Sequence, residues 1–220
     1  LAGVRRIPND PPNVGLLTFW GTRYNVVAGE GLCLLAPYPP FFLDVLLVDM
    51  SKKNKNPKFE NIRCKLEEDG EAKKDMKARS GGAVTVNVGM TWEPNRGDLI
   101  DYITAGREAG VMNIVNDMLG EVIRQVASGK TWEEMTFSKE WLSAKLITKM
   151  TGEGIPHVGS EANPSEIEAF LREALTNGKA DVHDLGIVFR RLNVIEVVPE
   201  GALKADAENA SREVQQRRAE

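Results

Sequence analysis

The alternation of apolar and polar residues is clearest at residues 83–92 (AVTVNVGMTW). One side of an extended chain would carry only large apolar side chains there: Val84, Val86, Val88, Met90 and Trp92. The other side would carry Ala, Thr, Asn and Gly. A strict period of two is typical of a strand with one face in the core, and it leaves no room for a helix.

Shorter apolar runs predict further strands on both sides of this segment. We expect strands at residues 14–20, 32–35, 45–50, 59–66 and 185–198. Glycines and prolines bound these runs, as turn residues bound strands. Residues 1–13, rich in Pro and Asn, indicate an extended lead-in, and the acidic and then basic stretch 67–79 indicates a solvated hairpin tip.

Helical spacing begins after Asp98, which is expected to cap a helix that Gly106 and Gly110 interrupt. The apolar stripe then recurs every three or four residues, as Val111, Ile114, Val115, Met118, Val122 and Val126. Gly129 lies where a helix commonly ends. This pattern predicts a long amphipathic helix packed on the core.

Capping signals predict three more helices. Thr131 and Glu134 form a capping box, and Ser138 is expected to cap the following helix. Asn163 and Pro164 open a helix that ends near Gly178, after a flexible connection over 151–162. Strands, then helices, then a returning strand predict an α+β domain whose last strand pairs with earlier ones.

The composition and the absence of known motifs argue against several classes of function. The net charge of −4 argues against a nucleic-acid partner. No phosphate-binding loop is present. Cys33 and Cys64 lie far apart and are interpreted as buried free thiols, and with only two histidines no zinc site is expected. His157 and His183 are interpreted as surface histidines without a nucleophile to activate, so no catalysis and no cofactor are expected.

A proline-broken aromatic segment lies between two predicted strands. Its candidate membrane-contact residues are Tyr38, Pro39, Pro40, Phe41, Phe42 and Leu43. Prolines keep the segment out of a central ladder, so its aromatic rings either pack in the core or face an apolar partner such as a bilayer.

The end of the chain is rich in Ala and Glu and predicts a helix. Its apolar residues recur by four, three and four, as Leu203, Ala207, Ala210 and Val214. That spacing is the seam of a coiled coil and makes these residues candidates for oligomerisation. An amphipathic helix docked on its own domain is the alternative.

The order of four segments resembles the SPFH (band 7) family, which includes stomatin, prohibitin and flotillin. The family's opening strands and proline turn correspond to LLTFWGTR (16–23) and VVAGEGLCLLAPYPPF (26–41), followed by VLLVDM (45–50). Its middle strand and helix start correspond to 83–103, and its long helix to 113–135. The closing strand and charged helix correspond to 186–216, whereas ARSGGAV departs from the family's T-x-D-G turn.

This resemblance implies an SPFH domain over residues 1–198, followed by the start of a coiled-coil helix at 199–220. Within it, 14–82 would be the β-rich part near the membrane and 83–198 the α/β part. The implied protein is a non-enzymatic, membrane-associated scaffold. Its subunits would form rings or cages that organise membrane microdomains or regulate a membrane protease or channel.

An anchor N-terminal to Leu1 is implied as well, and Arg5 and Arg6 beside it favour the cytoplasmic face. Two other functions stay open. One is a soluble adaptor that binds a single protein partner. The other is an enzyme whose site no motif reveals, which a pocket lined by titratable groups would indicate.

Overall fold

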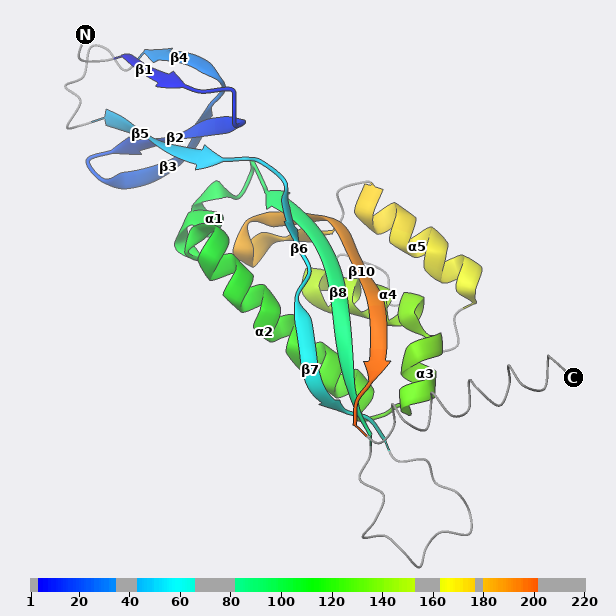
Figure 1. Ribbon diagram of the computed structural model, residues 1–220. Coiled ribbons are helices and arrows are strands. Elements are labelled where there is room, and N and C mark those ends of the chain that lie inside the picture. Colours follow the sequence, from blue (N-terminus) through cyan, green and yellow to red (C-terminus); the bar gives the residue numbers. More distant parts are fainter. Residues whose placement is uncertain (1–3, 35–42, 66–81, 153–162, 177–179, 202–220) are drawn as a thin grey trace, which may run out of the picture. The chain divides into compact units, whose positions relative to one another are not determined.

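The computed structural model describes residues 4–34, 43–65, 82–152, 163–176 and 180–201 (Figure 1). These residues form an α+β fold, as predicted. The strands are β1 (Val4–Ile7), β2 (Asn13–Phe19), β3 (Thr22–Ala28), β4 (Gly31–Leu34), β5 (Leu43–Asp49), β6 (Lys53–Lys55), β7 (Lys58–Arg63), β8 (Ala83–Pro94), β9 (Asp181–Val182) and β10 (Ile187–Pro199). The helices are α1 (Leu99–Thr104), α2 (Arg107–Ala127), α3 (Trp132–Phe137), α4 (Lys139–Thr151), α5 (Pro164–Thr176) and the short 3-10 helix η2 (His183–Leu185).

The chain divides into two compact units that interleave along the sequence. Unit 1 comprises Leu1–Asn54, Thr91–Ile114 and Ala174–Arg191, and unit 2 comprises Lys55–Met90, Val115–Glu173 and Leu192–Glu220. The strands β8 and β10 and the helix α2 each contribute residues to both units. The division predicted between residues 82 and 83 stays a prediction.

Unit 1 contains two small antiparallel sheets near the start of the chain (Figure 1). The strands β1 and β4 form one, and β3, β2 and β5 form the other in that order. The strands predicted at 32–35 and 45–50 correspond to β4 and β5. The strands β1 and β3 were not predicted, because most of their side chains are exposed and they lack a buried alternating stripe.

The hairpin between β2 and β3 closes through Trp20 and Gly21 alone. Both residues have positive φ angles, 51° and 80°. This is the combination that a type I′ turn needs, and it matches the twist of the flanking strands. Trp20 therefore belongs to the turn and not to the strand that the apolar run predicted through residue 20.

Unit 1 also includes α1, the start of α2 and the β9–η2 turn. Gly106, with φ of +94°, separates α1 from α2, which confirms the interruption predicted there. The interruption predicted at Gly110 is wrong, because Gly110 lies within the continuous helix α2. Gly186 lies directly after η2 with φ of +58°, and a Cβ there would come within 2.2 Å of the Asp98 carbonyl oxygen. Because only glycine fits, the start of α1 and the turn after η2 approach closely.

Unit 2 contains β7, most of β8 and the end of β10, together with α3, α4 and most of α5. The alternation predicted for β8 is confirmed, since Val84, Val86 and Val88 are fully buried. The strand order β6-β8-β10-β9, with β7 also paired to β8, places the returning strand β10 beside β8, as expected.

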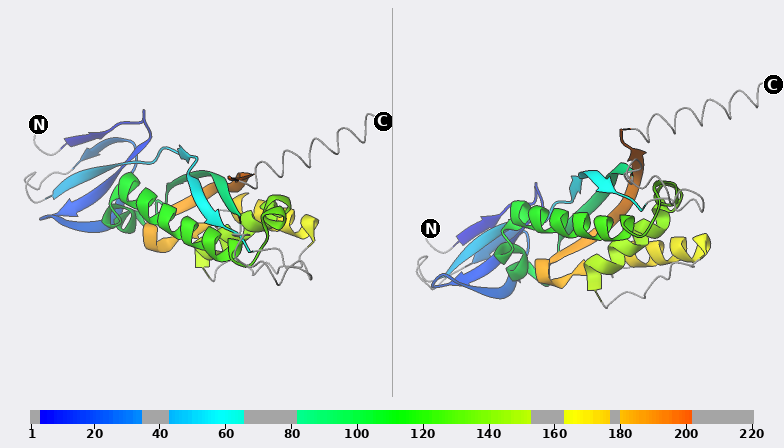
Figure 2. Two further views of the ribbon diagram at one scale, coloured as in Figure 1. Left: turned by 60° about the horizontal axis from the view of Figure 1, so that its bottom comes forward. Right: turned by 90° about the horizontal axis from the view of Figure 1, so that it is seen from below.

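The capping predictions in unit 2 are confirmed in part. Thr131 accepts from the Glu134 amide and Glu134 accepts from the Thr131 amide, which makes the predicted capping box. The Glu166 carboxylate accepts from the Asn163 amide at the start of α5. Ser138 precedes α4, but its hydroxyl donates to the Glu134 carbonyl and does not cap the helix. The helices α4 and α5 pack together through Ala144 and Ile167 (Figure 2).

Candidate functional site

Most of the predicted site residues lie outside the described residues. These are the membrane-contact candidates Tyr38, Pro39, Pro40, Phe41 and Phe42, and the oligomerisation candidates Leu203, Ala207, Ala210 and Val214. Leu43 is described, and it is half-buried at the start of β5 opposite Phe19 of β2. The neighbourhood of Leu43 is therefore where the membrane-contact prediction can be compared with the structure.

One face of the sheet β3-β2-β5 is apolar and only partly covered. Leu43, Val45 and Leu47 of β5 pair with every second residue of β2, so their side chains share a face with Leu17 and Phe19. Thr22 pairs with Phe19 and Ala28 with Gly15, and the register shifts between Leu16 and Thr18. By strand alternation we assign Tyr24 and Val26 of β3 to the same face as Thr22 and Ala28. We call this set the apolar face: Leu17, Phe19, Tyr24, Val26, Leu43, Val45 and Leu47.

Four side chains of the apolar face are exposed to solvent. The exposed fractions are 56% for Val26, 45% for Tyr24, 43% for Leu47 and 38% for Phe19. The opposite face of the same sheet contains Val14, Leu16 and Val48, which are buried. A sheet with one face in the core normally places polar residues on the other, so this exposed apolar face requires another explanation.

The strand β1 covers a small part of the apolar face. A Cβ atom at Gly15 would lie 2.8 Å from the Ile7 Cδ1 atom, so Ile7 packs directly on the glycine backbone. Ile7 is 2% exposed. Gly15 thus permits β1 to approach, while the side chains at the Tyr24 and Val26 positions remain exposed.

Trp20 extends the apolar surface at the tip of the β2–β3 hairpin. Its side chain is 71% exposed. A large residue with positive φ is a true outlier, since Asn, Asp and Gly supply almost all such turns. The strain of such a position is of the order of 1–3 kcal/mol and is found preferentially at binding sites.

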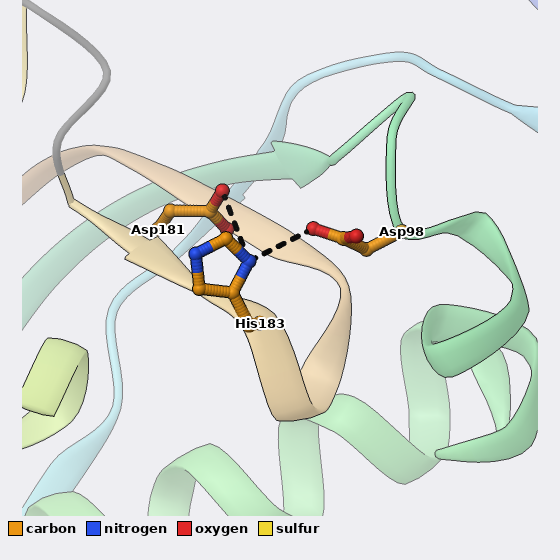
Figure 3. A group of neighbouring side chains, drawn as sticks. All are labelled: Asp98, Asp181 and His183. Carbon is orange, nitrogen blue, oxygen red and sulfur yellow. Dashed lines mark hydrogen bonds and ion pairs between the residues drawn. The ribbon is translucent and has the colours of Figure 1, made fainter.

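A second candidate site is polar and lies where the start of α1 meets the β9–η2 turn. The side chains of Asp98, Asp181 and His183 converge there (Figure 3). The His183 Nδ1 atom is 3.1 Å from Asp98 Oδ2 and 3.7 Å from Asp181 Oδ2. The Asn95 amide donates to the same two oxygens at 2.8 and 2.6 Å. We call Asp98, Asp181 and His183 the carboxylate–histidine cluster.

Charge and burial shift the pKa values of two residues in this cluster. The hydrogen bond to Asp98, aided by the charge of Asp181, holds the pKa of His183 above its ordinary value. Burial raises the pKa of Asp181, although the nearby imidazole opposes the shift. Asp181 Oδ1 is buried and has no hydrogen-bond partner among the described residues. Among the described residues, this cluster is the group of three side chains placed to hold a metal ion.

Lys53 lies at the centre of a third polar group, with Asp49, Ser51 and Glu108. Its ammonium donates to Asp49, lies 2.8 Å from Ser51 Oγ and forms an ion pair with Glu108 at 3.5 Å. Burial lowers the pKa of Lys53, but the contacts with the two carboxylates outweigh it and the pKa lies above its ordinary value. The raised pKa favours the charged ammonium, which is not the protonation state that the base of a Ser–Lys pair needs.

The described cysteines show no sign of a reactive thiol. Both are free, Cys64 is buried and Cys33 is half-buried, so the predicted burial is confirmed for Cys64 alone. Burial raises the pKa of Cys64 to about 11. A thiol with so high a pKa is a weak nucleophile at neutral pH.

The sequence did not point to the carboxylate–histidine cluster. Asp98 was predicted as a helix cap, but its side chain makes no capping hydrogen bond and binds Asn95 instead. His183 is exposed, as expected, yet lies beside an aspartate 85 residues away along the chain. Asp181 carried no signal, because it follows no motif and only the fold brings it to Asp98.

Comparisons with models of known protein families and with curated proteins find no match to this chain. In the described part of the chain, no helix has the length and apolar character that crossing a bilayer requires.

Proposed function

We propose that this chain is a non-enzymatic, membrane-associated scaffold of the SPFH (band 7) type, which assembles into rings or cages. The partners would be other copies of the chain and a lipid bilayer, with a membrane protease or channel as a further partner. Assembly through the seam of Leu203, Ala207, Ala210 and Val214 belongs to this proposal.

The observation that carries the membrane contact is the exposed apolar face of β3-β2-β5. Residues 4–47 include seven of the large apolar side chains that are exposed in the described residues: Val4, Phe19, Trp20, Tyr24, Val26, Leu32 and Leu47. Exposed apolar surface gathered in one region is typical of an interaction site, whereas scattered single residues are not. The same stretch of chain contains Leu43, the described member of the predicted contact segment.

The charges and aromatic residues around this face favour a bilayer as the partner. Residues 4–28 contain three arginines, Arg5, Arg6 and Arg23, and Asp10 as their one acidic residue. Basic residues are attracted to anionic lipid headgroups, at about 1 kcal/mol each near the surface. Trp and Tyr side chains, such as Trp20 and Tyr24, are preferred at the level of the headgroups.

The energy of one contact is small, which is why assembly belongs to the proposal. Complete burial of the exposed parts of Phe19, Tyr24, Val26 and Leu47 yields about 3–5 kcal/mol. That corresponds to weak binding of a single copy. Copies linked in a ring contact one bilayer together, and their effective concentration multiplies the weak contacts into stable attachment.

Liposome flotation tests the membrane contact. Vesicles of phosphatidylcholine and phosphatidylserine in a 3:1 ratio are mixed with the wild-type chain, with Tyr24→Ser/Val26→Ser, and with Phe137→Ser. Phe137, 88% exposed in α3, is the matched control outside the apolar face. We expect the double variant to lose most of its flotation and the control to float like wild type.

Two outcomes would contradict the proposal. Flotation of the double variant at the wild-type level would show that the apolar face does not contact lipid. Absence of flotation for the wild-type chain, together with saturable binding of one protein partner to the same face, would favour the soluble adaptor.

A further inference from the structure

We infer that Asp98, Asp181 and His183 form a binding site for one first-row divalent cation of the zinc or manganese class. This inference concerns residues away from the apolar face and does not depend on the proposed function. It rests on the spacing of the three donor atoms, on an unsatisfied buried oxygen and on the way the fold fixes the ligands.

The donor atoms are spaced as ligands around a single ion are. Zinc binds imidazole nitrogen and carboxylate oxygen at about 2.0–2.2 Å, so two ligands of a tetrahedral ion lie about 3.3–3.6 Å apart. The His183 Nδ1 atom lies 3.1 and 3.7 Å from the two aspartate oxygens. All three atoms lie within 4.8 Å of one another. The two distances from His183 bracket the ligand spacing of a tetrahedral ion.

A second observation comes from Asp181. Its side chain is 18% exposed, and its Oδ1 atom is buried without a hydrogen-bond partner among the described residues. A buried acceptor left unsatisfied costs about 1–3 kcal/mol, and more when it is charged. A cation bound through Oδ2, the oxygen that faces His183, neutralises the charge of this partly buried carboxylate.

The fold holds the ligands before any ion binds. The Asn95 amide donates to Asp98 Oδ2 and to Asp181 Oδ2, so one side chain orients both carboxylates. Groups that orient metal ligands in this way usually change the affinity 10- to 100-fold when they are lost. Gly186 adds a backbone constraint, since its close approach to the Asp98 carbonyl fixes η2 against α1.

The donor set selects the class of ion. One imidazole and two carboxylates suit zinc, manganese or ferrous iron, whereas calcium and magnesium prefer oxygen ligands alone. The His183 side chain is 77% exposed, so solvent can reach the remaining coordination positions. The inferred site therefore has three protein ligands, with water in the remaining coordination positions.

Calorimetric titration of the 220-residue chain with zinc chloride at pH 7.5 tests the inference. We expect one zinc ion per chain, and at least about 10-fold weaker binding for His183→Ala and for Asp181→Asn. His157→Ala is the matched control, because it removes the other histidine of the chain and leaves the cluster intact. Magnesium chloride is expected to give no saturable heat below 1 mM.

Absence of saturable zinc binding below 1 mM would overturn the inference, as would wild-type affinity in His183→Ala. Substitution of the exposed His183 is not expected to disturb folding, so its result is decisive even if Asp181→Asn folds poorly. Manganese gives an independent readout in proton NMR spectra of the two imidazoles. We expect substoichiometric Mn²⁺ to broaden the His183 signal of the wild-type chain, and equal broadening of that signal in Asp181→Asn would contradict the site.

Discussion

The strand β8 and the sheet β3-β2-β5 both carry large apolar side chains at alternate positions, but the stripe of β8 is covered whereas the apolar face of the sheet is partly exposed. Met90 is 2% exposed and Val88 is fully buried, whereas Val26 and Tyr24 of β3 are about half exposed. The hydrophobic effect acts on both surfaces. The difference shows that an apolar stripe predicts a surface that must be covered, and that the cover of the second surface can come from a partner.

Substitution of one residue on each surface is expected to give the largest difference in the free energy of unfolding. Met90→Ala in β8 is expected to lower the free energy of unfolding by about 2–5 kcal/mol, because it removes buried atoms and leaves a cavity. Val26→Ala is expected to change it by less than about 0.5 kcal/mol. Urea denaturation followed by circular dichroism measures both. An equal loss would mean that Val26 is covered within the chain and would remove the comparison.

Two glycines with positive φ extend the comparison to the backbone. Gly186→Ala is expected to cost about 2–4 kcal/mol, since the new Cβ adds a clash with Asp98 to an unfavourable conformation. Gly201 has φ of +60°, and a Cβ there would meet nothing within 4 Å among the described residues, so Gly201→Ala is expected to cost only about 1 kcal/mol. Thermal unfolding of the two variants side by side checks the order, and equal costs would contradict the close packing at Gly186.

The ion pair between Asp49 and Lys53, at the end of β5 away from Leu43, is expected to give the smallest effect on stability. This effect depends on pH. Burial raises the pKa of Asp49, but hydrogen bonds from Lys53 and Ser51 outweigh it, so the pKa lies below its ordinary value. A depressed carboxyl pKa stabilises the fold at pH values above about 4, and this stability is lost as the pH falls through the folded-state value. The pKa of Lys53 is raised, so its contribution is present below about pH 10 and is lost at higher pH.

Lys53→Met is therefore expected to cost about 1–3 kcal/mol at pH 7 and much less near pH 3. Guanidinium denaturation at the two pH values measures the difference. Arg172→Met is the matched control, because its ion pair with Glu168 is exposed on α5. A loss for Lys53→Met that does not depend on pH would show that the aliphatic stem, not the charge, stabilises this end of the sheet.

The sequence predicted those elements whose own residues determine them. The alternation in β8, the capping box at Thr131 and the helix start at Asn163 need only local chemistry, and all three are confirmed. The strand β3 was missed because Arg23, Tyr24 and Asn25 are exposed and do not alternate as a half-buried strand does. Pairing with β2 makes it a strand, and pairing is not visible in a local pattern.

The candidate sites were harder to predict than the fold, because they depend on contacts between residues that lie far apart in the sequence. The prediction that no zinc site exists was based on the small number of cysteines and histidines. The inferred cation site uses two aspartates as ligands instead. Asp98 and Asp181 come together because Gly186 permits η2 to approach α1. The apolar face was foreseen only at Leu43, since Tyr24 and Val26 belong to β3, which was not predicted as a strand.

The conformation of Trp20 has a practical consequence for fluorescence measurements on this protein. The other three tryptophans, Trp92, Trp132 and Trp141, are buried or half-buried. The indole of Trp20 is therefore the one most accessible to soluble quenchers such as acrylamide. A two-residue turn holds it at the tip of the hairpin. Its fluorescence thus reports, without any added label, whether that tip is in water or in a less polar environment.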